Sequence, residues 1–291
     1  MKPAVRIVLG LAAIAVIGIN LARIGRTRVA EQAPPGPPHE EAPSSYQIAE
    51  DSEPKSYCPA TRGTKSVHYG LFELEVERTA DDICAFRVWK FKGPTLAMDD
   101  GALAISAQYR DLDQDILPEL IVVADSGGSG GHADTFIFTS KPQPHLVAKY
   151  DGCATGVRVA PDGTRALQTC DLGMNMFESV CNACSPRPSI YYVLEKGELR
   201  NVNAQFVNEF DKEIKEEEQA LKPEDVKNFL ETKSEDDNEY IDAPARSIVL
   251  RIAVDYIFSG REAKAREVIN KNWPAFDRER ILQELTSRGP H

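Results

Sequence analysis

Histidines are few in this sequence, acidic residues outnumber basic ones, and the motifs of the common hydrolases are missing. Neither Gly-x-Ser-x-Gly nor His-Glu-x-x-His occurs, and the five histidines show no metal-binding spacing. Lysine and arginine number 34 against 45 aspartates and glutamates, a net charge of −11. Because a phosphate backbone is bound by clustered basic residues, this balance argues against nucleic acid as a main partner. These absences favour a binding protein over a hydrolase.

What is present is the composition of a folded protein. The 291 residues are 42% hydrophobic and 27% charged, and the length suits roughly two domains. Wholesale disorder and a polytopic membrane protein are both disfavoured by these values.

Residues 1–28 have the layout of a membrane anchor or export signal. Lys2 and Arg6 precede an apolar run of 16 residues, from Ile7 to Ala22. Its end offers no pair of small residues at signal-cleavage spacing, which favours an uncleaved anchor over a removed signal. No cysteine lies near the run, so a lipid-anchored lipoprotein is excluded.

Residues 29–56 are rich in proline and poor in apolar residues, as in a disordered, extended tether. An anchor followed by a tether predicts an inner-membrane-anchored protein with a periplasmic or extracellular body, or a secreted protein if the N-terminal segment is cleaved. The predicted partner of residues 1–28 is therefore the membrane.

Residues 57–203 are expected to form short strands separated by turns. Phe72, Leu74 and Val76 alternate with glutamates, the period-two pattern of a strand with one solvent-facing side. Further strands are predicted at 83–91, 103–109, 120–124, 135–139, 146–150, 166–169 and 189–194. Hairpin turns such as Asp162-Gly163 bring the expected total to about nine or ten strands. We expect an antiparallel β domain, a sandwich or a partial propeller.

Residues 204–291 are predicted to be helical, which makes the chain α+β overall. Phe206, Phe210 and Ile214 have helical spacing, a short helix is expected at 226–230, and an acidic loop at 234–239. Between Glu195 and Asp242 there are 16 acidic and 7 basic residues, a net of −9. This acidic first half is either a solvated surface or a docking surface for a basic protein partner.

The last helices resemble a single tetratricopeptide repeat unit. The residues at that family's signature spacing are Val249, Ile252, Ala253, Tyr256, Gly260, Ala265 and Ile269. A peptide-binding groove in the family takes about three units, so packing is favoured over peptide capture here. Asp277 is expected to cap a final helix containing Ile281, Leu282 and Leu285.

The sharpest motif is an acidic loop followed by the apolar run 120–124. Carboxylates at its positions 1, 3, 5 and 9 and a carbonyl at position 7 can surround Ca²⁺; these are Asp111, Asp113, Asp115, Glu119 and Leu117. From Leu103 to Gly131 the sequence resembles the calcium loops of FG-GAP and VCBS repeats, which occur in integrin-type propellers and many secreted bacterial proteins. That resemblance implies Ca²⁺ on the four carboxylates.

One position departs from the family pattern. The sixth residue, usually glycine, is Ile116, and a β-branched residue is costly at positive φ. Either the loop bends differently or it binds Ca²⁺ weakly. The alternative is an acidic hairpin whose carboxylates accept bonds from its own amides.

A glycine-rich loop follows at 125–132. A strand rather than a helix is predicted after it, which disfavours phosphate binding. The loop is either a flexible hairpin or a place where a ligand approaches the backbone between Asp125 and His132.

All six cysteines fall within residues 57–203: Cys58, Cys84, Cys153, Cys170, Cys181 and Cys184. Proximity favours pairing Cys58 with Cys84, whereas the other four allow three pairings. Structural disulfides are favoured in an exported domain. Zinc binding by the clustered four, or redox activity at Cys181-Asn182-Ala183-Cys184, are the alternatives.

These observations predict a membrane-tethered extracytoplasmic binding protein with a calcium loop. A thiol-disulfide oxidoreductase using Cys181 and Cys184 is the alternative from another class. A carbohydrate-active enzyme on the β scaffold would rest on analogy of fold alone.

Overall fold

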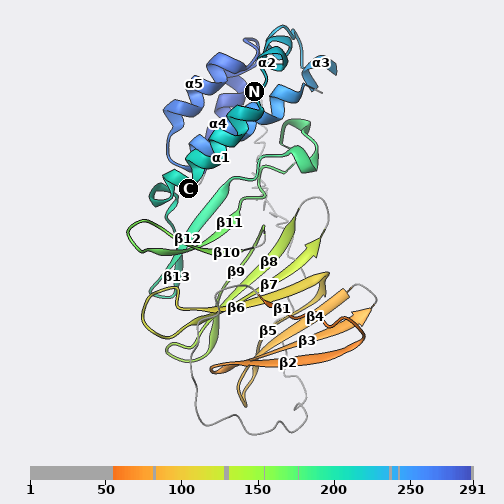
Figure 1. Ribbon diagram of the computed structural model, residues 1–291, viewed down its shortest axis with the longest axis vertical. Coiled ribbons are helices and arrows are strands. Elements are labelled where there is room, and N and C mark those ends of the chain that lie inside the picture. The colour runs from red at the N-terminus through yellow and green to blue at the C-terminus, as the bar shows by residue number, and fades with distance from the viewer. Residues whose placement is uncertain are drawn as a thin grey trace, which may run out of the picture.

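The structure is a computed structural model that describes residues 55–289 except 81–82, 128–130, 154, 176, 236–237 and 242. Three antiparallel sheets are followed in the chain by helices, and in Figure 1 these layers succeed one another from the orange strands to the blue helices. The predicted antiparallel β domain and the α+β class are confirmed. Of the predicted anchor and tether, only Lys55–Ser56 is described, and it forms the short strand β1 instead of extended tether.

The first sheet is a four-stranded meander in chain order: β2 (Gly63–Tyr69), β3 (Phe72–Ala80), β4 (Ile83–Lys90) and β5 (Thr95–Ala102). Phe72, Leu74 and Val76 are at most 1% exposed, as their alternation predicts. Glu73 is only 4% exposed, so the glutamate face of this strand is not uniformly solvated. The edge strands β2 and β5 were not predicted, because an edge strand needs no apolar alternation.

The second sheet lies in the middle of the β region and is apolar on both faces. Its order is β1, β6 (Ala104–Arg110), β7 (Glu119–Gly127), β8 (His132–Thr139) and β9 (His145–Gly152). Leu120 and Val122 pack toward the first sheet, whereas Ile121 and Val123 belong to a separate apolar cluster shared with the third sheet. A strand covered on both faces explains the uninterrupted apolar run 120–124.

The third sheet consists of β10 (Gly156–Val159), β11 (Arg165–Cys170), β12 (Ser189–Glu195) and β13 (Glu198–Asn201), again in chain order. A sandwich, one of the two predicted architectures, has two sheets, whereas this structure has three stacked sheets. Each sheet contains one consecutive four-stranded meander, as a propeller blade does. Short 3₁₀ turns at Phe177–Ser179 and Asn182–Cys184 interrupt the long connection between β11 and β12.

Helices cover the outer face of the third sheet. They are α1 (Val207–Ala220), α2 (Pro223–Leu230), α3 (Asn238–Ile241), α4 (Pro244–Phe258), α5 (Glu262–Asn272) and α6 (Arg278–Ser287), after a 3₁₀ turn at Asn203–Gln205. Helix α3 therefore begins within the predicted acidic loop. Tyr191 of β12 stacks on Phe206 with ring centroids 4.1 Å apart, and both belong to one cluster with the buried residues of α1 and α4. The hydrophobic core thus continues across the predicted boundary at residue 203.

Asp277 precedes α6 but does not cap it with its side chain. Its carboxylate is 1% exposed and accepts hydrogen bonds from Tyr240, Trp273 and Arg280. The predicted cap is therefore wrong, because inward-facing donors outcompete the first-turn amides for this carboxylate.

Candidate functional sites

The acidic loop joins β6 to β7 and brings three of its predicted ligands together. One carboxylate oxygen from each of Asp111, Asp113 and Asp115 lies within 4.8 Å of the others. Asp111 and Asp113 are half-buried and Asp115 is more exposed. Oxygen atoms at this spacing can contact one hard cation simultaneously.

Hydrogen bonds from the loop's own amides hold these side chains. Asp111 accepts from the amides of Asp115 (2.9 Å) and Ile116 (3.2 Å), and Asp115 accepts from Leu117 (3.1 Å). Ile116 has φ of 82° and is 82% exposed. Ile116 therefore adopts a positive φ, where glycine is usual, at a backbone cost. A different bend and weak Ca²⁺ binding both stay predictions.

Two basic side chains from other hairpins approach the loop. The ammonium group of Lys141, just after β8, makes an ion pair with Asp115 and lies 4.0 Å from Asp113. Arg165 of β11 donates to the Asp111 carbonyl at 2.7 Å and lies 3.8 Å from its carboxylate. The cluster therefore attracts cationic groups, and Lys141 is a competitor for any metal ion there.

Glu119 lies behind this cluster and is not one of its converging ligands. Its carboxylate is fully buried and accepts from the Leu112 amide at 2.9 Å and the Thr139 hydroxyl at 3.4 Å. Burial, reinforced by Asp113 and Asp111, raises the pKa of Glu119 to about 7. Burial is also the main reason that the pKa of Asp113 is raised. A divalent cation would relieve this accumulation of negative charge.

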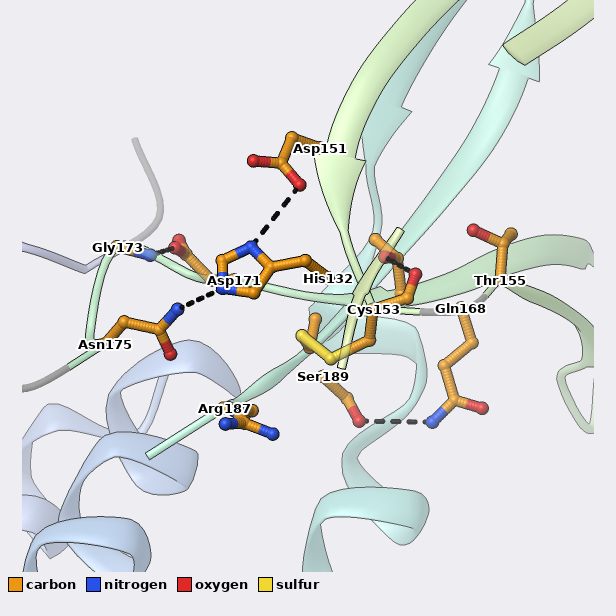
Figure 2. The surroundings of a disulfide bond; sticks show 12 residues. His132, Asp151, Cys153, Thr155, Gln168, Asp171, Gly173, Asn175, Arg187 and Ser189 are labelled. Atoms are coloured by element: carbon orange, nitrogen blue, oxygen red, sulfur yellow. Dashed lines mark hydrogen bonds and ion pairs between the residues drawn. A yellow bond between two sulfur atoms is a disulfide. The ribbon is translucent and has the colours of Figure 1, made fainter. Parts of the chain in front are cut away.

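A pocket of about 540 Å³ opens where β8 begins and β9 and β11 end, beside the Cys153–Cys170 disulfide. His132 lines it, together with Tyr150, Asp151, Asp171, Asn175 and Tyr192. In Figure 2 the imidazole points between Asp151 and Asn175. The His132 Nδ1 atom is 3.9 Å from Asp151, and Nε2 is 3.1 Å from the Asn175 amide nitrogen.

Only His132 of the predicted ligand pair reaches this pocket. Asp125 lies in β7, where it accepts a hydrogen bond from the Gly127 amide at 2.7 Å. The glycine-rich loop identified one wall of the pocket, but the other walls come from distant segments without a local motif.

All six cysteines are paired, as Cys58–Cys84, Cys153–Cys170 and Cys181–Cys184, with Cα–Cα distances of 6.0, 5.1 and 5.0 Å. The predicted Cys58–Cys84 pairing is confirmed, and the two further disulfides leave none of the six as a thiolate ligand for zinc. Cys181 is exposed and precedes a 3₁₀ turn in which the Cys184 amide donates to its sulfur at 3.1 Å.

Comparison of the chain with known protein families, curated proteins and solved structures gives no match. Within the described part of the chain, no helix combines the length and apolar character needed to cross a membrane. The predicted anchor at residues 1–28 lies outside the described residues.

Proposed function

We propose that this chain is a calcium-binding interaction protein of the extracytoplasmic space, held at a membrane by its N-terminal segment. The observation that carries the proposal is the convergence of Asp111, Asp113 and Asp115 within 4.8 Å, in a loop where Ile116 adopts a positive φ. Ca²⁺ prefers carboxylate and carbonyl oxygens, so the Leu117 carbonyl is the further ligand that the motif offers, while the predicted ligand Glu119 lies behind the cluster and adds negative charge there. Bound Ca²⁺ would pin the β6–β7 connection and stabilise the central sheet.

The extracytoplasmic location is supported by three disulfides within one β region, because such bonds persist in oxidising compartments. The tether and the anchor are inferred from sequence pattern alone. A basic protein partner on the acidic helical region also stays a prediction; part of that acidity is used internally, since Glu217 pairs with Arg251 at 2.8 Å and Asp211 pairs with Arg261.

Calcium should raise the thermal unfolding temperature of the wild type by about 5 °C near 100 times Kd. Asp113→Asn should lose most of this shift, because it removes one charge from the cluster. Asp162→Asn alters an exposed carboxylate in the neighbouring β10–β11 turn and serves as the matched control. Equal shifts in the wild type and Asp113→Asn would contradict the proposal.

Lys141→Ala should bind Ca²⁺ about tenfold more tightly than the wild type, because a fixed positive charge leaves the site.

One observation favours a second candidate function, thiol-disulfide exchange at Cys181 and Cys184. Cys181 is an exposed residue and its sulfur accepts a backbone hydrogen bond, an arrangement that favours a thiolate once the pair is reduced. Pro186 and Pro188 follow, and the turn is only three residues long, so no helix dipole adds to this effect.

Non-reducing peptide mapping after thiol blocking in intact cells separates these functions and tests the compartment. For the binding protein we expect all three pairs to be oxidised throughout. For an oxidoreductase, a fraction of Cys181 and Cys184 would be blocked as free thiols while the other four stay paired. Blocked thiols at all six positions would instead contradict the extracytoplasmic location.

A further inference from the structure

The pocket beside Cys153–Cys170 has a chemical character different from that of the acidic loop. Asp151 and Asp171 line it, and none of its lining residues is a lysine or an arginine. Arg187 and Arg288 lie outside the lining and donate to the carbonyls of Asn182 (2.8 Å) and Gly173 (3.1 Å). The lining itself therefore carries two formal negative charges.

His132 lies beside Asp151 at the rim of this pocket. The Asn175 side-chain nitrogen lies 3.1 Å from Nε2 of the imidazole. The Nδ1 atom lies 3.9 Å from the Asp151 carboxylate, and the Asp151 side chain is 63% exposed.

Two tyrosine rings form an aromatic wall. The centroids of Tyr150 and Tyr192 lie 6.0 Å apart, with the ring planes at 46°. The Tyr150 hydroxyl is bonded to Thr155 at 2.9 Å, and burial raises the pKa of Tyr150 to about 12, so the ring stays neutral. The pKa of Tyr192 is raised by burial and then by the Asp171 carboxylate, which lies close to it. Aromatic faces attract cations.

We propose that this pocket binds an organic cation, an ammonium or guanidinium group on a short apolar stem, between Asp151, Asp171 and the faces of Tyr150 and Tyr192. The volume of about 540 Å³ is in the range of small-molecule sites. The cation enters the tyrosine-lined space and its charge meets the two carboxylates. The site is independent of the calcium loop, and neither proposal depends on the other.

The same cationic group occurs in free amines and in basic peptide side chains. The full chain, purified in detergent, is titrated calorimetrically with agmatine and spermidine, and separately with N-acetyl-arginine amide and N-acetyl-lysine amide. Chitobiose and succinate are the neutral and anionic comparisons. We expect saturable binding of cations only; tighter binding of the first pair assigns a free amine, and of the second pair a peptide side chain.

The double variant Asp151→Asn/Asp171→Asn should bind the best cation at least tenfold more weakly, because both charges are lost while the amides preserve the shapes. Asp162→Asn, outside the pocket, should bind as the wild type does. Thermal unfolding of the double variant without ligand confirms that it is folded. No saturable cation binding up to about 10 mM, stronger binding of chitobiose or succinate, or equal affinity in the folded double variant would each overturn the proposal.

Discussion

Replacing Glu119 by Gln is expected to make the calcium-free protein about 3 kcal/mol more stable at pH 8, and this gain should disappear toward pH 4.5. Glu119 is fully buried, and its pKa rises from 4.5 to about 7 on folding, chiefly through burial. The folded state therefore holds the proton more tightly than the unfolded state. The stabilisation of the folded state by the proton bound to Glu119 is complete below pH 4.5 and is lost as the pH rises through 7.

Urea unfolding of both proteins between pH 4.5 and pH 8, in a calcium chelator, measures this difference. Glutamine keeps an acceptor for the Leu112 amide, so the comparison isolates the charge. Glu77→Gln, on the exposed side of β3, is the control and should change stability by less than about 0.5 kcal/mol. Adding Ca²⁺ should shrink the advantage of Glu119→Gln, because the cation compensates the same negative charge. If the stability of Glu119→Gln depended on pH in the same way as that of the wild type, the pKa of Glu119 would not be raised in the folded state.

Removing the Cys153–Cys170 disulfide by the double change to Ala should cost roughly 3 kcal/mol of stability. The bond closes a sequence separation of 17 residues and joins the end of β9 in the second sheet to the end of β11 in the third. The Thr169 hydroxyl donates to the Cys153 carbonyl at 3.0 Å beside it, and a Cβ on Gly152 would lie 2.5 Å from the Thr169 hydroxyl oxygen. The two sheets are therefore in close contact at this point.

The Cys181–Cys184 pair is the matched comparison, because its separation is only three residues. Its removal should cost less, roughly 2 kcal/mol, since a shorter loop loses less entropy in the unfolded state. Chemical unfolding of the two double variants measures both values. A smaller loss for Cys153–Cys170 than for Cys181–Cys184 would contradict the role of the former as the link between sheets.

The parts of the fold that the sequence predicts are those with a periodic apolar pattern. The run 120–124 is the central strand β7 because both of its faces are buried, and the spacing in α4 places Val249, Ile252 and Ala253 in the core. Strands β2 and β5 escape prediction because each forms the edge of its sheet, where polar residues are tolerated. Stacking of three sheets depends on long-range packing, which a local pattern does not encode.

The same distinction applies to the sites. The acidic loop is contiguous, so its three converging carboxylates follow from sequence spacing. Lys141 and Arg165 reach the loop from other hairpins and had no sequence signal. The pocket assembles residues from β8, β9, β11, β12 and the segment after β11, and only His132 beside the glycine-rich loop pointed to it. The charge and aromatic lining of that pocket emerge only on folding.

The central claim is that the loop at residues 111–119 binds Ca²⁺, and a crystal structure of residues 55–291 grown with CaCl₂ tests it most directly. The account predicts an anomalous peak coordinated by Asp111, Asp113 and Asp115, with the ammonium group of Lys141 displaced from Asp115. A loop in which Lys141 stays paired with Asp115, without a metal peak at about 10 mM Ca²⁺, would contradict the claim and leave the loop as a hairpin closed by an internal ion pair.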